Sequence, residues 1–119
     1  MDKVKILICD DEEGVRESLR LILEKDYELV FANDGEETIN KIKQDNEIKI
    51  ILMDIKMPKR DGLNMLKQVK RDFPGVSVIM ITGYQTAEIA AEAIKLGALD
   101  YIVKPIDSKQ VLTSIRKLI

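Results

Sequence analysis

The chain has 119 residues, which is the size of one compact domain that folds without a structural metal or disulfide. Its formal net charge is −2, from 19 basic and 21 acidic residues, so no strong positive field attracts nucleic acid or an anionic membrane. The single cysteine, Cys9, excludes a disulfide framework, and no apolar run approaches the ~18 residues of a membrane span. We therefore expect one cytoplasmic domain over residues 1–119, with no signal peptide and no direct contact with nucleic acid or membrane.

Short apolar runs alternate along the chain with segments whose apolar residues recur at helical spacing, a pattern typical of α/β folds. Strands are predicted at residues 4–9, 28–32, 48–53, 76–81 and 100–103, and helices at residues 13–25, 36–44, 62–72, 86–96 and 108–118. Asp61 is placed to cap the third helix and Gly97 to end the fourth. Because the strands are continuously apolar, we expect a parallel sheet covered by helices on both faces.

Most of these strands end in an ionic or hydroxyl side chain. Asp10 and Asp11 follow the first strand, Asp54 the third, Thr82 the fourth and Lys104 the fifth. Ligands of parallel α/β sheets bind beyond the carboxyl ends of the strands, so these side chains are expected to converge on one pocket. The alternative for any single acid is a helix cap, which Asp10 or Asp11 could provide for the first helix.

The expected pocket has the chemistry of phosphoryl transfer. Carboxylates at ~4 Å repel by about 4 kcal/mol per pair at an effective dielectric near 20, so a cluster requires a cation. Oxygen ligands without histidine favour Mg²⁺, with Mn²⁺ as a substitute. Asp54, alone after its strand, is the predicted covalent acceptor; Asp10 and Asp11 hold the metal, while Thr82 and Lys104 bind phosphoryl oxygens. The chain has no histidine and no GxxxxGK[ST] loop, so the phosphoryl group must come from another molecule.

The motifs resemble the receiver domain of two-component response regulators over essentially the whole chain. The acid pair, the segment LMDIKMPKRDG around Asp54, Thr82-Gly83 and Lys104-Pro105 occur in the order and spacing of that family. The resemblance implies a doubly wound, flavodoxin-like α/β fold with a five-stranded parallel sheet in the order 2-1-3-4-5. It also implies a regulatory phosphoacceptor rather than an enzyme, which assists its own phosphorylation and dephosphorylation.

The resemblance assigns further roles around the pocket. Mg²⁺ is implied to bind Asp11, Asp54 and the backbone carbonyl of Lys56, with Asp10 acting mainly through a metal-bound water. The peptide bond before Pro105 is implied to be cis, against the sequence base rate of ~5% for such bonds. The phosphoryl donor is implied to be the phosphohistidine of a histidine kinase or phosphotransfer protein.

The resemblance also implies a pair of switch residues that couple phosphorylation to a signal, and two further residues are predicted to affect the lifetime of the phosphate. Thr82 is drawn toward the phosphoryl group while Tyr101 turns inward, which alters the face formed by the fourth helix, fifth strand and fifth helix. The alternative for Tyr101 is simple packing with its hydroxyl in water. Lys56 and Tyr84 are bulky rim residues that predict slow self-hydrolysis of the acyl phosphate, although Lys56 could equally be a solvated loop charge.

The partners follow from the same resemblance. The kinase is expected to dock over the start of the first helix and the loop after the fifth strand, at Gly14, Val15, Ser18, Pro105 and Ile106. The stretch TGYQTAEIAAEAIKLGALDYIVKP resembles receivers of nitrogen-regulator-type transcriptional activators, so a downstream output domain or protein and a phosphorylation-dependent dimer are expected. Whether the receiver stands alone or regulates a longer protein stays open.

Other classes of protein share parts of this pattern. A haloacid-dehalogenase-like phosphatase also uses an Asp nucleophile, but its first-strand DxD motif is missing here. A pseudo-receiver that binds partners without carrying phosphate typically lacks the acceptor, the acid pair or the lysine, all of which are present. A flavodoxin would need a Ser/Thr/Gly-rich loop after the first strand, and that loop is absent.

Overall fold

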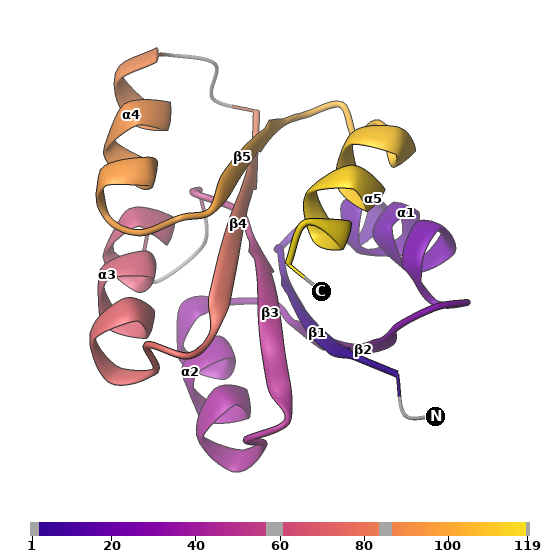
Figure 1. The fold of residues 1–119 in the computed structure, drawn as a ribbon, viewed down its shortest axis with the longest axis horizontal. Helices are drawn as coiled ribbons and strands as arrows, with labels where there is room; N and C mark the ends of the chain where they lie inside the picture. The colour runs from indigo at the N-terminus through magenta and orange to yellow at the C-terminus, as the bar shows by residue number, and fades with distance from the viewer. Residues whose placement is uncertain (1–2, 57–60, 84–86, 119) are drawn as a thin grey trace.

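The computed structural model describes residues 3–56, 61–83 and 87–118, and it shows one sheet between two layers of helices (Figure 1). The strands are β1 Lys5–Cys9, β2 Glu28–Ala32, β3 Ile48–Met53, β4 Ser77–Thr82 and β5 Asp100–Val103. The helices are α1 Glu13–Leu23, α2 Gly35–Gln44, α3 Gly62–Asp72, α4 Ala87–Lys95 and α5 Ser108–Arg116. The five strands are parallel and run in the order 2-1-3-4-5, which confirms the predicted fold class.

Alternate residues of each strand pack on opposite faces of the sheet, because successive side chains of a strand point in opposite directions. In β1, Ile6 and Ile8 pack with α1 and α5, whereas Leu7 and Cys9 pack on the face that α2, α3 and α4 cover. All four side chains are at most 1% exposed. Burial on both faces explains why the strand is continuously apolar in the sequence.

The observed boundaries differ from the predicted ones by one or two residues. β4 extends through Thr82, because Thr82 pairs with Val103 of β5, a partnership that apolar patterning does not reveal. α2 begins one residue earlier than expected, where the Asp34 carboxylate accepts a 2.9 Å hydrogen bond from the Glu37 N–H. α1 and α5 both end two residues early, at Leu23 and Arg116. The predicted start of the fourth helix at position 86 lies outside the described residues.

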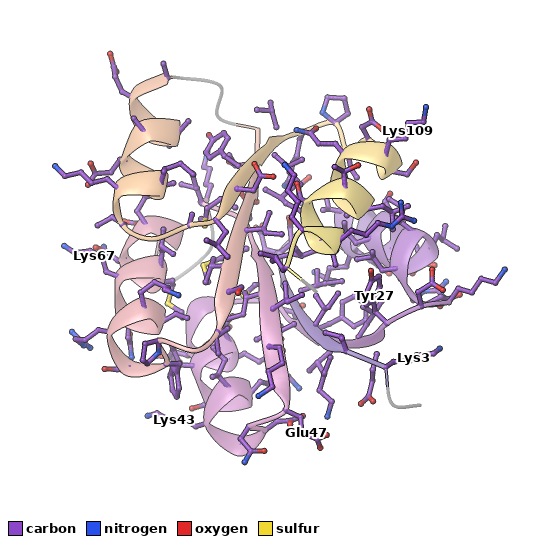
Figure 2. All side chains as sticks on the ribbon, viewed as in Figure 1. Lys3, Tyr27, Lys43, Glu47, Lys67 and Lys109 are labelled. Atoms are coloured by element: carbon purple, nitrogen blue, oxygen red, sulfur yellow. The ribbon has the colours of Figure 1, made fainter. Side chains whose placement is uncertain are left out.

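Charged side chains surround this core. Figure 2 shows the labelled Lys43, Lys67 and Lys109 pointing away from the sheet, whereas Tyr27 lies against the apolar layer beneath α1. Within the described part of the chain, no helix combines the length and the apolarity that crossing a bilayer requires.

Candidate functional site

The residues predicted to form the pocket continue the sheet by one step beyond the strands. The backbone N–H of Asp10 donates to Ala32 at 3.2 Å, that of Asp54 to Cys9 at 3.0 Å, and that of Lys104 to Thr82 at 2.8 Å. These three residues therefore sit at the same carboxyl edge of the sheet, held by the last ladder hydrogen bonds. Because β1 lies beside β3 in the sheet, Asp10 and Asp54 become neighbours.

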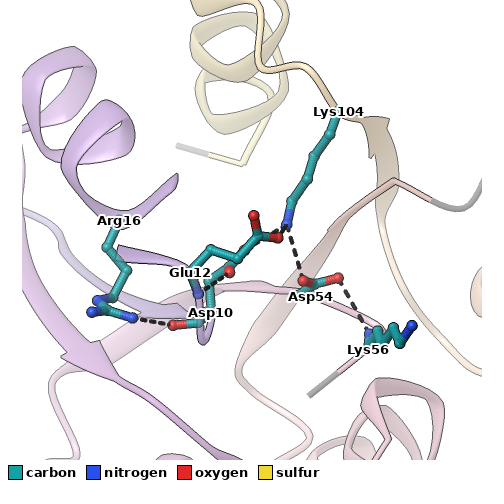
Figure 3. Close-up of polar contacts among 6 residues, drawn as sticks. All are labelled: Asp10, Glu12, Arg16, Asp54, Lys56 and Lys104. Carbon is teal, nitrogen blue, oxygen red and sulfur yellow. Dashed lines mark hydrogen bonds and ion pairs between the residues drawn. The ribbon is translucent and has the colours of Figure 1, made fainter. Parts of the chain in front are cut away.

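A single ammonium group joins the acids of this edge (Figure 3). The Nζ atom of Lys104 lies 3.0 Å from Asp10 Oδ2, 2.9 Å from Glu12 Oε1 and 3.0 Å from Asp54 Oδ2. The Asp10 and Asp54 side chains are only 3% and 5% exposed, and Lys104 is 15% exposed, whereas Glu12 is 61% exposed. The site is thus a cluster of two buried acids and one exposed acid around one shared cation.

Burial and charge act in opposite directions on these groups. Burial is the main cause that raises the pKa of Asp10, with a further contribution from the negative charge of Asp54, while the Glu12 N–H and Lys104 oppose the rise. Burial alone would lower the pKa of Lys104, but its hydrogen bonds to Glu12, Asp54 and Asp10 outweigh that effect and raise it. Lys104 is therefore a permanent cation at neutral pH.

Backbone groups orient the carboxylates of the pocket. The Glu12 N–H donates to Asp10 Oδ1 at 2.9 Å, and the Lys56 N–H donates to Asp54 Oδ1 at 3.2 Å (Figure 3). Arg16 holds the loop from outside by donating to the Asp10 carbonyl at 2.8 Å. The residue before α1 is Glu12, whose own side chain makes no capping hydrogen bond. The Asp10 carboxylate therefore supports the start of α1 through the Glu12 N–H while it also faces Lys104 in the pocket.

Gly62, at the first position of α3, packs directly on the backbone that carries Asp54. A Cβ atom at Gly62 would lie 2.3 Å from the Asp54 carbonyl oxygen and 2.5 Å from Ile55 Cα, distances that no side chain can occupy. The Gly62 N–H also donates to the Ile55 carbonyl. The Asp61 carboxylate caps α3 as predicted, by accepting a 2.9 Å hydrogen bond from the Asn64 N–H.

The carboxylates form a set of donors suited to a hard divalent cation. Asp10, Asp11, Glu12 and Asp54 each offer an oxygen, and these four atoms lie within 4.8 Å of one another. The single thiol of the chain, that of Cys9, contacts the Thr38 hydroxyl in the core, and burial raises the pKa of this thiol to about 12. All-oxygen coordination fits Mg²⁺ or Mn²⁺ and disfavours zinc or copper.

The remaining predicted residues occupy different depths around the pocket. Thr82 is fully buried at the end of β4, Lys56 is exposed, and Tyr101 is half-buried beside the α4 layer. Burial is the main cause that raises the pKa of Tyr101, and the charge of Asp54 adds to it. The peptide bond between Lys104 and Pro105 is cis. Tyr84 lies outside the described residues.

The predicted docking residues gather near α1 and the loop after β5. Val15 and Ile106 pack on the same apolar cluster between α1, α5 and the sheet, and both are half-buried. Gly14, Ser18 and Pro105 are exposed. The structure thus provides an accessible surface at the predicted footprint.

Sequence reasoning did not assign a role to Glu12 or to the close packing of Gly62. The signal for Glu12 was a third acid directly after the Asp10-Asp11 pair, and the signal for Gly62 was a glycine at the first position of a predicted helix. The role of Glu12 depends on contact with Lys104, 92 residues away, and that of Gly62 on how closely α3 approaches Asp54 and Ile55.

Known proteins share this arrangement across almost the whole chain. A family model described as the response regulator receiver domain matches residues 6–116. The transcriptional regulatory protein ZraR of Escherichia coli K12 is 32% identical over 117 residues, which are 98% of this chain and 26% of ZraR. The regulatory protein AtoC of the same strain is 38% identical over 104 residues, which are 87% of this chain and 22% of AtoC. The chain therefore spans about a quarter of the length of these curated relatives.

Solved structures agree with the family match. A CheY-like response regulator receiver domain protein from Methanospirillum hungatei has 33% identity and a TM-score of 0.90, covering 99% of this chain and 94% of that one. The CheX-CheY-BeF3-Mg²⁺ complex from Borrelia burgdorferi contains a chain with 30% identity and a TM-score of 0.94, with coverage of 98% and 90%. Together, the fold, the pocket at the carboxyl edge and the family match show that this chain belongs to the response regulator receiver domains of two-component signalling.

Proposed function

We propose that Asp54 accepts a phosphoryl group from the phosphohistidine of a histidine kinase or phosphotransfer protein, in a reaction that depends on Mg²⁺. The observation that carries this proposal is the Asp54 carboxylate, whose side chain is 5% exposed and which is held between the Lys56 N–H and the Lys104 ammonium. A carboxylate fixed in this way is positioned for attack before the donor arrives, which lowers the entropic cost of the transfer.

The transfer exchanges one bond for another. An Asp54 carboxylate oxygen attacks the phosphorus atom, an O–P bond forms, and the N–P bond of the phosphohistidine breaks. The electron pair of that bond returns to the imidazole, which takes up a proton, and the product is an aspartyl phosphate. Lys104 neutralises a phosphoryl oxygen, and Thr82 is the proposed hydroxyl donor to another.

The acidic residues of the pocket are the proposed magnesium ligands. Asp11, Asp54 and the backbone carbonyl of Lys56 would hold the ion directly, and Asp10 would contribute through a metal-bound water. When bound, Mg²⁺ supplies positive charge that offsets the repulsion among the carboxylates and the incoming phosphoryl oxygens. The grouping of four carboxylate oxygens within 4.8 Å supports this assignment.

Phosphorylation is proposed to act on the face formed by α4, β5 and α5. Thr82 and Tyr101 are the proposed switch residues, since Thr82 ends β4 beside Asp54's strand and Tyr101 lies half-buried on β5. Moving a two-state element from 1:99 to 99:1 requires about 5.5 kcal/mol. Hydrogen bonds to charged groups contribute roughly 1.5 to 3 kcal/mol each, so Thr82, Lys104 and backbone donors together reach that range. Lys56 and Tyr84 are the proposed rim residues that slow hydrolysis.

The domain is proposed to work in the cytoplasm as a regulatory phosphoacceptor for an output domain or partner protein. This proposal is supported by relatives that are transcriptional regulatory proteins about four times as long as this chain. The domain is proposed to regulate a transcriptional activator of the nitrogen-regulator type and to form a dimer when it is phosphorylated.

Intact mass measurement tests the central proposal. The protein is incubated with Mg²⁺ and acetyl phosphate, and in parallel with a phosphorylated histidine kinase. We expect one added phosphoryl group that disappears in Asp54→Asn and in the presence of a chelator. If the wild-type protein gains no mass from either donor, the alternative of a phosphate-independent binding module replaces the proposal. Steady release of inorganic phosphate from diverse phosphate esters would instead indicate an Asp-nucleophile phosphatase.

The docking footprint has its own test. Gly14, Val15, Ser18, Pro105 and Ile106 are proposed to contact the kinase, so Ser18→Asp should slow transfer from the kinase several-fold. The same variant should accept phosphate from acetyl phosphate at the wild-type rate, because the small donor needs no docking surface. Unchanged transfer from the kinase would exclude this footprint.

A further inference from the structure

Glu12 is the only exposed acid among the three that share the Lys104 ammonium. The Nζ atom has three N–H donors, and three carboxylate oxygens lie 2.9 to 3.0 Å from it. Asp10 and Asp54 are buried and are also held by backbone N–H groups, whereas the Glu12 side chain is 61% exposed. In the unphosphorylated protein, the ammonium therefore donates to Glu12 and Asp54 and forms an ion pair with Asp10.

A phosphoryl group on Asp54 requires a donor from Lys104, so one of these contacts has to open. Releasing Asp10 would leave a buried charge without its cation, which is strongly unfavourable. Asp54 itself carries the phosphoryl group and stays beside the lysine. Glu12 can turn into water at small cost, because an exposed ion pair is weak.

We propose that the Glu12 carboxylate binds the Lys104 ammonium in the unphosphorylated state, where a phosphoryl oxygen binds after phosphorylation. Phosphorylation then displaces Glu12 from Lys104. The inference rests on the proposed function of Asp54. Glu12 acts through Lys104 and is a positioning residue. Glu12 keeps the Lys104 ammonium at the pocket, but it also competes with the phosphoryl group for that ammonium. The negative charge of Glu12 in addition repels the phosphoryl group.

Glu12 also lies within the group of four carboxylates, so direct metal binding is the competing role. The two roles predict opposite effects of removing its charge. If Glu12 competes for Lys104, its removal strengthens binding of a phosphoryl group. If Glu12 holds the metal, its removal weakens binding of both the metal and the phosphoryl group.

The test measures the affinity for fluoroberyllate, an anion that binds an aspartate carboxylate as a phosphoryl mimic, by fluorine NMR at saturating Mg²⁺. Glu12→Gln should bind it about two- to fivefold more tightly than wild type, as expected for removal of an exposed ion pair. Glu13→Gln is the matched control: it removes the same charge from the next residue, which is exposed and lies in the first turn of α1. This control should bind fluoroberyllate like the wild type.

Mg²⁺ affinity without fluoroberyllate is the second measurement, by isothermal titration calorimetry. Glu12→Gln and Glu13→Gln should bind Mg²⁺ with affinities that agree within about twofold. A large loss of Mg²⁺ affinity in Glu12→Gln alone would assign Glu12 to the metal and overturn the inference. Equal or weaker fluoroberyllate binding by Glu12→Gln, or an equal gain in Glu13→Gln, would overturn it too.

Failure of the inference can be told apart from failure of the proposed function. A wild-type protein that binds fluoroberyllate and gains one phosphoryl group retains the proposed function, whatever Glu12→Gln does. If the wild-type protein binds no fluoroberyllate in the presence of Mg²⁺ and gains no phosphoryl group, both the proposed function and the inference about Glu12 are wrong.

Discussion

At the level of single residues, the positive charge of Lys104 only partly compensates the negative charges of Asp10 and Asp54. Two carboxylates that are almost fully buried share one ammonium, so each acid is stabilised by the lysine and destabilised by its neighbour. The net effect on Asp10 is a raised pKa, caused first by burial and then by the charge of Asp54. Binding of a cation or a phosphoryl group therefore acts on a site that already contains electrostatic strain.

Replacing the buried Asp10 carboxylate by a neutral side chain should stabilise the folded protein. Because the pKa of Asp10 is raised on folding, the folded state binds the proton more tightly, and this stabilisation is lost as pH rises through the folded pKa. At pH 7 the carboxylate carries the full cost of burial. Asp10→Asn, which keeps an oxygen for the Glu12 N–H, should raise the free energy of unfolding on the order of 1 kcal/mol.

Urea denaturation at several pH values checks this prediction. The difference between Asp10→Asn and wild type should narrow as pH falls toward the ordinary aspartate pKa of ~3.9, because the wild-type carboxyl then becomes neutral as well. A variant less stable than wild type at pH 7 would show that the ion pair with Lys104 outweighs burial.

At the scale of secondary structure, the site depends on how closely α3 approaches the end of β3. The backbone of Gly62 lies against Asp54 and Ile55 with no room for a side chain. The Asp61 cap determines where α3 begins, and Gly62 sets how closely that first turn of the helix approaches Asp54. A change at the start of α3 is therefore transmitted directly to the backbone of Asp54.

Gly62→Ala should be destabilising by about 2 kcal/mol or more, because the new Cβ forces backbone atoms apart in a packed region. The same variant should accept phosphate from acetyl phosphate more slowly. Gly14→Ala is the control for stability: a methyl group there would meet none of the described residues within 4 Å, and alanine favours a helix such as α1 by roughly 0.5 to 1 kcal/mol. Urea midpoints that moved in the same direction for both variants would contradict the close packing.

At the scale of the whole molecule, the parallel sheet brings distant segments to one edge. The strand order 2-1-3-4-5 sets β1 beside β3 and β4 beside β5, so the acids, the threonine and the lysine arrive from four different strands. Helices on both faces bury the sheet and hold these strand ends in register. A cation bound among these carboxylates would therefore stabilise the fold as a whole.

Mg²⁺ should therefore stabilise the folded protein. At ten times its dissociation constant, a ligand that binds only the folded state adds ~1.4 kcal/mol to the free energy of unfolding. We expect a higher melting temperature with MgCl₂ than with NaCl of equal ionic strength, and a much smaller difference in Asp54→Asn. An equal response of the two proteins would place Mg²⁺ binding away from Asp54.

Much of this architecture is determined by the sequence alone. Continuous apolar runs require strands buried on both faces, and the polar residues that end them mark one edge of the sheet. The order of the elements, the Asp61 cap and the core position of Cys9 follow from such local patterns, and the structure agrees with them. The acceptor role of Asp54 and the magnesium ligands follow from residue chemistry and family resemblance, and remain predictions.

Other features are decided only by the tertiary structure. Glu12 and Lys104 are 92 residues apart in the chain, and they meet because β1 and β5 end at the same edge. Gly62 has to be a glycine because the backbone of Asp54 and Ile55, just after β3, lies against it. The end of β4 at Thr82 is set by pairing with β5. Apolar periodicity reports which residues are buried, but side-chain reach, backbone clearance and strand pairing depend on distances that exist only after the chain has folded.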